Sequence, residues 1–561
     1  MTVSNEEKLE YAAVDKSLAN FFCSRLVGVS ENNINKINDI ICQLSNGINN
    51  GHTCIYLLGE QVKLLIASGL ASDGQVIKPF VIDNKQLYFY RYWKYEVNIT
   101  RLIKHLLNTK LEPAEEEINR ILNQLFPLGK IDTSVDGVDW QRSAVENSIK
   151  HNFSIITGGP GTGKTTTVIK LLGALIALAG SENIHIALAA PTGKASSRLQ
   201  ASIVGSKSWL KKELGNTLEK IPEKVSTIHG LLQPKYFSPY FKYNHTNCLP
   251  YDVVVIDEAS MIDVALMSKL LQALKPSARI ILLGDKHQLS SVEVGSVLSD
   301  LTIALPQYTY ELKKTYRFGG AIKDLALAVN AQKNDLAFEV LTSKDNTVSL
   351  LPHGVNALMF IVSKYIEYIQ VVRKNLSNVD NAFQAFNHFQ VLCSNNIGRY
   401  GVEGINYHVE NGLAYHKLIS NSNTWYAGKP IMISQNVKTS NLNLSNGDIG
   451  ICLPNSDDKL QIYFEDGKGG YKKYSPSKLP QYTTAYAMSI HKSQGSEFLD
   501  VLIALPEKPN QIMTKELLYT AITRAKKSVR IVGSVELLGV MIKQRVKRDG
   551  GLIKHIEESE L

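Results

Sequence analysis

Short apolar runs alternate with helical stretches from about residue 131 onward. Four of these runs end in small or charged residues: Phe153–Thr157, Ile184–Ala189, Val253–Ile256 and Ile280–Leu283. Short apolar runs that alternate with helices are typical of the strands of a parallel sheet. The pattern therefore predicts an open α/β sheet, and such a sheet binds its ligands at the carboxyl ends of its strands.

Two other regions complete the chain on either side of this first α/β region. Residues 1–125 read as helical segments with local strand character, as in Gln86–Trp93. A second α/β region runs from about 350 to 561, and residues 425–482 within it are rich in Gly, Asn, Asp and Tyr. We therefore predict domains at 1–125, 126–345 and 346–561, with a small β-rich insertion at about 425–482.

Residues 200–250 interrupt the first α/β region. A Lys-rich stretch there precedes KYFSPYFKYN (Lys235–Asn244), in which aromatic and basic residues are mixed. Such a mixture suits base stacking, but an insertion also needs a small core of its own. We favour a packed loop or hairpin. Four basic residues near the C-terminus are expected to form a solvated or DNA-facing edge: Lys543, Arg545, Lys547 and Arg548.

Composition limits the classes of protein to consider. The chain has 561 residues, 44% hydrophobic and 20% charged, so roughly three to four domains are expected. This balance excludes collagen-like, coiled-coil and wholly disordered proteins. The longest apolar run, Leu171–Ala179, is too short to cross a membrane, and the start MTVSNEEKLE is not a signal or transit peptide. We expect a soluble, cytoplasmic protein without membrane association.

The net charge of +9 comes from one part of the chain. Residues 1–130 hold 14 basic and 14 acidic side chains, whereas residues 131–561 hold 47 basic and 38 acidic ones. A basic body is compatible with a polyanionic partner, although an excess of this size is a weak signal. The six cysteines form no C-x-x-C pair, which favours reduced thiols over a zinc site or disulfides.

The sequence GGPGTGKT (Gly158–Thr165) follows the first expected strand and opens a helical stretch. This is the setting of a phosphate-binding loop, in which glycines let backbone N–H groups point at an anion. Lys164 is expected to bridge the β- and γ-phosphates of ATP, and Thr165 to offer its hydroxyl to Mg²⁺. The pattern therefore predicts an ATP site.

Three polar residues follow two later strands. Asp257 and Glu258 emerge at the carboxyl end of Val253–Ile256, where Asp257 is placed to bind Mg²⁺ and Glu258 to polarise the attacking water. Gln288 lies in the polar turn after Ile280–Leu283. Because a neutral amide can sense a γ-phosphate by hydrogen bonding, we expect Gln288 to couple hydrolysis to motion.

Two arginines are candidates for arginine fingers, Arg317 in LKKTYRF and Arg524 in ELLYTAITRAKK. A guanidinium that reaches the γ-phosphate neutralises charge in the transition state. Because Arg524 belongs to the second α/β region, we expect the nucleotide to be clamped between two domains.

A series of motifs extends along the chain: GGPGTGKT, APTGKASSRL (190–199), STIHGLL (226–232), VVVIDEASM, LLGDKHQL, KTYRF, MSIHKSQGSEF (488–498) and LYTAITRAK (518–526). In this order they resemble the motifs of superfamily 1 DNA helicases. With VLCSNNIGRYGVEGIN (391–406) and SNGDIGI (445–451), the series more narrowly resembles the RecD family, the alpha subunits of bacterial exodeoxyribonuclease V (RecBCD). The resemblance covers roughly 130–561, and 1–125 only loosely.

The resemblance implies an α/β fold with two RecA-like phosphate-loop motor domains, a small β-rich insertion in the second and a mainly helical N-terminal domain. It implies an ATP-dependent 5′-to-3′ DNA helicase that acts on DNA ends in double-strand break repair by homologous recombination. RecB-like and RecC-like subunits would be its partners in a heterotrimer. We expect the N-terminal domain to be the partner-docking module, because it is neutral and carries no catalytic motif. The nuclease site would belong to the RecB-like subunit, since no suitable carboxylate and lysine spacing occurs here.

The resemblance also carries site residues over. Gln141 would contact the adenine, and residues of the second motor would close over the nucleotide. The full cofactor set, which uses ATP and Mg²⁺, is Gln141, Gly158, Gly159, Pro160, Gly161, Thr162, Gly163, Lys164, Thr165, Thr166, Gln494, Gly495 and Glu497. The single-strand channel would be lined by Pro191, Thr192, Lys194, Thr227, His229, Ser489, His491 and Lys492.

Two other functions stay open. A stand-alone RecD-like helicase would carry a longer N-terminal region with helix-hairpin-helix character, and residues 1–125 contain no paired G-x-G hairpins. An ATP-switched DNA-binding subunit would hydrolyse ATP without productive unwinding. The intact candidate catalytic residues argue against a dead motor, but they do not prove unwinding. A phosphate-loop ATPase that does not act on DNA would have no reason to carry STIHGLL or IHKSQGSEF.

Overall fold

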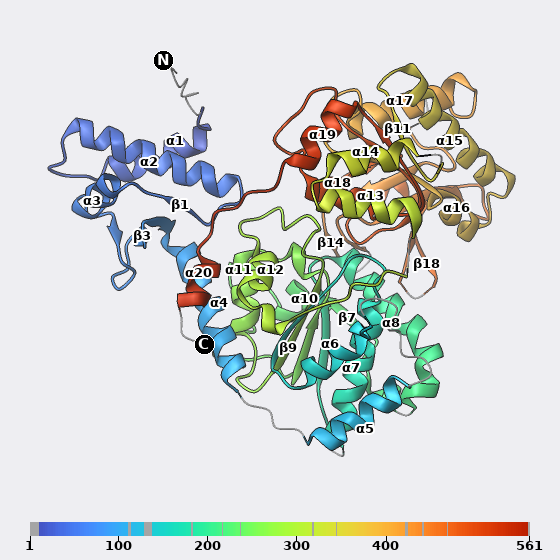
Figure 1. The fold of residues 1–561 in the computed structure, drawn as a ribbon. Helices are drawn as coiled ribbons and strands as arrows, with labels where there is room; N and C mark the ends of the chain where they lie inside the picture. The colour runs from blue at the N-terminus through green and yellow to red at the C-terminus, as the bar shows by residue number, and fades with distance from the viewer. Residues whose placement is uncertain are drawn as a thin grey trace.

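The computed structural model of the chain describes residues 10–109, 114–127, 137–180, 183–215, 217–235, 237–316, 319–343, 345–420, 424–439, 442–467 and 469–558. Two parallel sheets, which we call the first and second motor sheets, form the body of the molecule, and a smaller unit lies at the N-terminal side (Figure 1). The expected α/β fold with two RecA-like units is confirmed.

The first motor sheet has six parallel strands in the order β10-β5-β9-β8-β6-β7. Alternate residues of its central strands enter two separate hydrophobic cores, one on each face, which explains why these strands are mostly apolar. The strands are β5 (Phe153–Thr157), β6 (Ile186–Ala190), β7 (Val225–Thr227), β8 (Val253–Ile256), β9 (Arg279–Gly284) and β10 (Thr309–Glu311).

Helices cover both faces of this sheet. Several begin at residues that sequence rules favour: Asp139 accepts hydrogen bonds from the backbone N–H groups of Gln141 and Arg142, and Asp263 accepts one from Leu266. The helices are α6 (Trp140–Ile149), α7 (Lys164–Ala179), α8 (Gly193–Leu214), α9 (Thr217–Lys220), α10 (Ile228–Leu232), α11 (Val264–Gln272) and α12 (Val297–Ala304).

The second motor sheet has five parallel strands in the order β11-β22-β21-β12-β20. These are β11 (Val348–Leu351), β12 (Phe389–Cys393), β20 (Ala487–Ser489), β21 (Phe498–Ala504) and β22 (Ala525–Val532). The accompanying helices are α13 (Gly320–Asn330), α14 (Asn334–Thr342), α15 (Val355–Lys374), α16 (Val379–Phe386), α17 (Val402–Tyr415), α18 (Lys515–Ile522) and α19 (Val535–Lys543).

An antiparallel β-module lies between β12 and β20 in the chain. Its five-stranded sheet has the order β18-β17-β16-β13-β19, and a small hairpin, β14 (Val437–Lys438) with β15 (Asn443–Leu444), accompanies it. A separate core of six side chains, including Ile433 and Phe464, stabilises it. The strands are β13 (Pro430–Ile433), β16 (Ile449–Pro454), β17 (Leu460–Glu465), β18 (Tyr471–Tyr474) and β19 (Tyr482–Thr484).

The N-terminal unit with its own core is shorter than the predicted domain 1–125. It contains α1 (Ala13–Cys23), α2 (Glu31–Asn49), α3 (Gly59–Ala67) and a four-stranded sheet of β1 (Cys54–Tyr56), β2 (Ala71–Ser72), β3 (Phe80–Asp83) and β4 (Gln86–Phe89). The next helices, α4 (Tyr90–Asn108) and α5 (Glu115–Leu125), pack on opposite faces of the first motor sheet. An amphipathic helix does not reveal in its sequence which core its apolar face joins.

The C-terminal segment also crosses the expected boundaries. After α19 the chain leaves the second motor sheet, and its last helix, α20 (Leu552–Glu558), packs against α4 and α12 (Figure 1, red). On the way, Arg548 donates hydrogen bonds to the carbonyl oxygens of Ser291, Glu293 and Gly295. The prediction of a solvated or DNA-facing edge is therefore wrong for Arg548, which joins the C-terminal segment to the first motor unit.

Within the described part of the chain, α15 alone is long and apolar enough, by length and composition, to cross a membrane. The expectation that no segment reaches that length overlooked this helix. Core helices satisfy the same criteria, and seven side chains of α15, including Ile361 and Tyr365, are buried in the second motor unit.

Candidate functional site

The phosphate loop lies where the sequence places it, between β5 and α7. Gly161 and Gly163 have φ angles of 78° and 85°, a conformation that only glycine adopts without strain. A Cβ on Gly158 would lie 2.7 Å from Oγ1 of Thr162, so the loop also needs a bare backbone there. The ammonium group of Lys164 donates hydrogen bonds to the carbonyl oxygens of Gly158 (2.6 Å) and Gly159 (3.1 Å). The lysine therefore lies over the loop that is to cradle phosphates.

A cavity of about 630 Å³ opens beside this loop, between the two motor units. Its size is in the range of small-molecule and cofactor sites. The structure brings most of the predicted ATP-site residues to its wall: Gln141, Pro160, Gly161, Gly163, Lys164, Thr165, Thr166, Asp257, Glu258, Gln288, Glu497 and Arg524. Gly158, Gly159, Thr162, Gln494 and Gly495 lie outside this lining, and Arg317 lies outside the described residues.

The acidic pair follows β8 directly. Burial, together with the charge of Glu258, raises the pKa of Asp257 to about 6, and the nearby Lys164 opposes this rise. Glu258 has a φ of 52°, and its N–H donates to Oδ1 of Asp257 at 2.9 Å. A left-handed conformation at a residue other than glycine costs about 1–3 kcal/mol and is concentrated at functional sites. The strained backbone at Glu258 therefore supports its assignment as a functional residue.

The second motor unit reaches the site through Arg524, just beyond the end of α18. Its side chain is 2% exposed. The guanidinium donates to the side-chain oxygen of Gln288 (2.8 Å) and to the carbonyl oxygen of Thr520 (3.1 Å). Gln288 in turn donates to Oδ2 of Asp285 at 3.2 Å. The predicted γ-phosphate sensor and the predicted arginine finger are thus in direct contact across the domain boundary.

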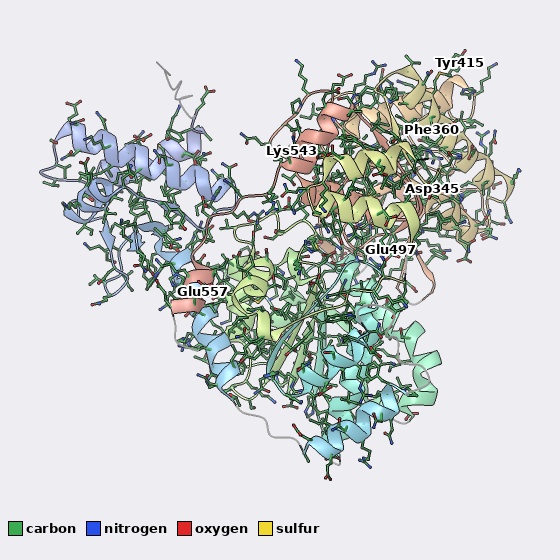
Figure 2. The ribbon with its side chains drawn as sticks, in the orientation of Figure 1. Asp345, Phe360, Tyr415, Glu497, Lys543 and Glu557 are labelled. Atoms are coloured by element: carbon green, nitrogen blue, oxygen red, sulfur yellow. The ribbon has the colours of Figure 1, made fainter. Side chains whose placement is uncertain are left out.

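Glu497 lies at the boundary between the two motor units (Figure 2). It forms ion pairs with Arg198 of α8 and, at 3.1 Å, with Lys526 of β22. Arg198 and Lys526 both line the cavity, yet neither was assigned a role from the sequence. Burial lowers the pKa of Arg198, while Glu258 and Asp257 oppose that shift. No spacing rule identifies Arg198, because Glu497, with which it forms its ion pair, belongs to the other motor unit.

The DNA-contact candidates of the first motor unit lie at helix starts. Oγ1 of Thr192 accepts a hydrogen bond from the N–H of Ala195 (3.2 Å), and Oγ1 of Thr227 accepts one from Gly230 (3.0 Å). Both hydroxyls therefore cap helices. Pro191 is half-buried, whereas His229 is exposed, with its ring 5.6 Å from that of Phe241.

Lys194 lies in a second cavity of about 600 Å³ between α8 and the β-module. Its ammonium nitrogen is buried and has no hydrogen-bond partner among the described residues, and burial lowers the pKa of Lys194 to about 8. The cavity also contains Asp448 and Glu465. In this arrangement the Lys194 ammonium does not face an open groove, because it is buried and Ser445, which follows β15, packs against the neighbouring Gly193.

The candidates of the second motor unit, Ser489, His491 and Lys492, are half-buried at the end of β20. Lys492 donates a hydrogen bond to the side chain of Asn446 in the β-module, and burial lowers the pKa of both His491 and Lys492. The β-module thus contacts Lys492 of the second motor unit and, in the first, Gly193, which lies between the candidates Thr192 and Lys194.

The aromatic loop after α10 is only partly packed. The prediction of a packed loop holds for two of its four described rings, Phe241 and Tyr243, and not for the other two. Phe241 is buried in the core, and Pro234 pairs with it in a short bridge. Phe237 is fully exposed and Tyr240 is 70% exposed. Exposed rings between lysines offer surfaces on which unpaired bases can stack.

Two family models match parts of the chain. Residues 141–294 match the family model of an AAA domain, and residues 484–532 match that of the UvrD-like helicase C-terminal domain. Among solved structures, a crystal structure of Bacteroides Pif1 bound to single-stranded DNA matches with a TM-score of 0.39 and 16% identity, over 73% of this chain and 94% of that one.

Curated relatives are more similar. The chain is 36% identical to RecBCD enzyme subunit RecD of Haemophilus influenzae, over 86% of this chain and 82% of that protein. It is 33% identical to the RecD subunit of Mycobacterium tuberculosis, over 88% and 84% of the two chains. The ATP-dependent RecD2 DNA helicase of Deinococcus radiodurans is 28% identical over 74% of this chain but only 52% of that protein. The chain therefore belongs to the RecD family of superfamily 1 helicases.

Proposed function

We propose that this protein is an ATP-driven 5′-to-3′ motor on single-stranded DNA. It acts as the RecD subunit of a three-subunit helicase–nuclease with RecB-like and RecC-like partners, and unwinds DNA ends in double-strand break repair. The observation that carries the proposal is the composite cleft, in which the phosphate loop and Gln288 of the first motor unit meet Arg524 of the second. A nucleotide bound there contacts both units, so hydrolysis changes how they are held together.

The site suits a magnesium nucleotide. The hydroxyl of Thr165 and the carboxylate of Asp257 line the same cavity, and hard oxygen donors of this kind are the ligands that Mg²⁺ prefers. A magnesium ion bound by them would neutralise charge on the β- and γ-phosphates. Glu258 orients the attacking water, and Lys164 and Arg524 supply positive charge.

The partners and the polarity rest on the family. The Haemophilus and Mycobacterium relatives are named as subunits of the RecBCD enzyme. The motif series carries the 5′-to-3′ direction, and the nuclease belongs to another subunit. The candidate DNA contacts form a channel across both motor units once the β-module moves away from Gly193.

ATP hydrolysis by the purified chain, with and without single-stranded DNA, tests the proposal. We expect DNA to stimulate hydrolysis and Lys164→Gln to reduce it at least about a hundredfold, because the phosphates lose a charged donor in the transition state. Lys150→Gln is the matched control, since Lys150 directly follows α6, forms an ion pair with Glu146 and does not line the cavity. A rate of ATP hydrolysis that does not change when single-stranded DNA is added, or that is unchanged in Lys164→Gln, contradicts a translocating motor.

Direction and assembly need two further measurements. Unwinding of duplexes with a 5′ tail but not of those with a 3′ tail supports the polarity, and the reverse preference refutes it. Co-purification with RecB-like and RecC-like subunits separates a RecBCD subunit from a stand-alone helicase. DNA-stimulated hydrolysis without unwinding, even in that complex, would favour an ATP-switched DNA-binding subunit.

A further inference from the structure

Tyr519 of α18 is buried at the boundary between the two motor units. It is 5% exposed, and its hydroxyl donates a hydrogen bond to Oδ2 of Asp285 at 3.0 Å. Asp285 belongs to the first motor unit and follows β9, and the two residues are 234 positions apart in the chain. A buried hydroxyl and a buried carboxylate thus join the second unit to the loop that contains Gln288.

Asp285 holds that loop in place. It is 1% exposed; Oδ1 accepts the N–H of His287 (2.9 Å), and Oδ2 accepts the side-chain amide of Gln288 (3.2 Å). Because the amide donates to Asp285, the side-chain oxygen of Gln288 is left to accept from Arg524. Asp285 therefore determines which end of the Gln288 amide faces the arginine.

The hydrogen bonds close into a ring. Starting at Tyr519, the ring passes through Asp285, Gln288 and Arg524, and returns to α18 through the carbonyl oxygen of Thr520. The side-chain oxygen of Thr520 adds a parallel link, since it accepts the N–H of Leu289 at 2.9 Å. Tyr519 and Thr520, two neighbouring residues of α18, thus form hydrogen bonds with both ends of the loop from Asp285 to Leu289.

The tyrosine hydroxyl also touches the phosphate loop. A Cβ placed on Gly159 would lie 3.1 Å from this oxygen, so Tyr519 packs on the bare backbone beside the site expected to bind phosphates. Burial, followed by the charge of Asp285, raises the pKa of Tyr519 well above its ordinary value. The hydroxyl therefore remains protonated and acts as a permanent donor.

We propose that Tyr519 is a positioning residue that makes ATP hydrolysis depend on the docking of the second motor unit. Through Asp285 it orients Gln288 and, through Gln288, the guanidinium of Arg524 toward the terminal phosphate. When the two units separate, the hydrogen bond to Asp285 breaks and Gln288 loses its orientation. This inference rests on the proposed ATP-driven motor and adds to it the group that reports domain closure.

The test replaces Tyr519 by phenylalanine, which removes only the hydroxyl. We expect kcat for ATP hydrolysis to fall about tenfold, the usual effect of losing one hydrogen bond to a charged group, while KM for ATP changes less than about twofold. In the Gln288→Ala background, Tyr519→Phe should change kcat by less than about twofold, because the residue through which it acts is already missing.

Tyr426→Phe is the matched control. The Tyr426 hydroxyl also donates to a carboxylate, Glu410 at 2.8 Å, but that bond lies wholly within the second motor unit. Its kcat should stay within about twofold of the wild-type value. Thermal unfolding of each variant shows whether it is folded. If Tyr519→Phe does not fold, Thr520→Val tests the parallel link to Leu289 and should lower kcat in the same way.

The outcomes separate the two claims. Wild-type hydrolysis that does not respond to DNA refutes the proposed motor, whereas a folded Tyr519→Phe with wild-type kcat refutes the positioning role. Equal losses of kcat in Tyr519→Phe and Tyr426→Phe also refute it, because a general loss of packing would then explain both. A large further loss on adding Tyr519→Phe to Gln288→Ala shows that Tyr519 does not act through Gln288. No hydrolysis by the wild type under any condition refutes both claims.

Discussion

Replacing Glu96 by glutamine should remove much of the pH dependence of stability at the joint between the N-terminal unit, the first motor unit and α20. Glu96 lies on α4 and is 1% exposed. Its carboxyl group accepts hydrogen bonds from the hydroxyl of Thr53 (2.6 Å) and the N–H of Gly551 (3.1 Å). Burial raises the pKa of Glu96 from 4.5 to about 8, since these bonds do not offset the loss of water.

The magnitude follows from proton linkage. Between pH 4.5 and 8 the native carboxyl group binds a proton that the unfolded chain releases, so stability falls as the pH rises. Each pH unit in this window costs about 1.4 kcal/mol, and the full shift amounts to about 5 kcal/mol. The contribution is fully present below pH 4.5 and is lost as the pH rises through 8. From pH 6 to pH 8 the wild type should lose about 2 kcal/mol from this group.

Glutamine keeps the shape and can accept the same hydrogen bonds, but it does not ionise. Urea unfolding at pH 6, 7 and 8, followed by tryptophan fluorescence, measures the effect. Trp93, one of four tryptophans, lies one turn away on α4 and contributes to that signal. We expect the variant to gain about 2 kcal/mol relative to the wild type across this range. Glu60→Gln, a change at an exposed glutamate of α3, removes a carboxylate from the same unit and should show no such gain.

Two results would contradict the reasoning. If the difference between variant and wild type is constant from pH 6 to pH 8, Glu96 does not take up a proton on folding. If the variant instead loses stability as the pH rises, Glu96 is ionised and paired, and the nearest candidate is the imidazole of His555 at 3.6 Å. Burial lowers the pKa of His555, which argues for a neutral ring and a neutral carboxyl group at this joint.

Three further predictions concern the cleft and the C-terminal segment. Arg524→Ala should lower kcat for ATP hydrolysis about a thousandfold, the typical effect of losing an arginine finger. Arg530→Ala, at a residue of β22 that stacks on Phe360, is the control and should change kcat less than about threefold. A loss under tenfold in Arg524→Ala would refute the assignment. Because the pKa of Asp257 is raised to about 6, this carboxylate becomes protonated as the pH falls below 6. The Mg²⁺ concentration for half-maximal ATP hydrolysis should therefore rise roughly tenfold per pH unit below pH 6. A Mg²⁺ concentration that stays the same from pH 8 to pH 5 would contradict this prediction. Leu552 is 1% exposed where α20 packs against α4 and α12, so Leu552→Ala should lower the free energy of unfolding in urea by about 2–5 kcal/mol. Val535→Ala, at a side chain that is 50% exposed, should lower it by under about 1 kcal/mol. Similar losses in the two variants would mean that α20 adds nothing to stability.

Local sequence was sufficient to identify the phosphate loop and the strands around it. The loop requires glycines, a lysine and a helix start within eight residues, and these requirements act over one turn of the chain. The strands could also be predicted from the sequence, because a strand that is buried on both faces has a nearly continuous apolar sequence. For the same reason Asp257 and Gln288 could be placed at strand ends, where parallel sheets expose their ligands.

The sequence did not predict which elements of different units pack against one another. No periodicity could show that α4 and α5 cover the first motor sheet, or that α20 returns from the second motor unit to pack beside α4. The apolar stripe of a helix shows that it is covered, but not by what. The domain limit at 125 was drawn where the motif pattern changes, whereas the core with its own strands ends near Phe89.

The chain by itself thus determined the chemistry of each half of the cleft: a phosphate cradle with carboxylates on one side and an arginine on the other. Only the tertiary structure decided how the halves meet, because Arg524 and Gln288 are 236 residues apart and their contact depends on two docked surfaces. Tyr519, Asp285 and Arg198 gain their roles at that boundary, and Lys194 is enclosed by the β-module. Hydrogen bonds between distant segments follow from the shapes of both surfaces, and no local pattern encodes those shapes.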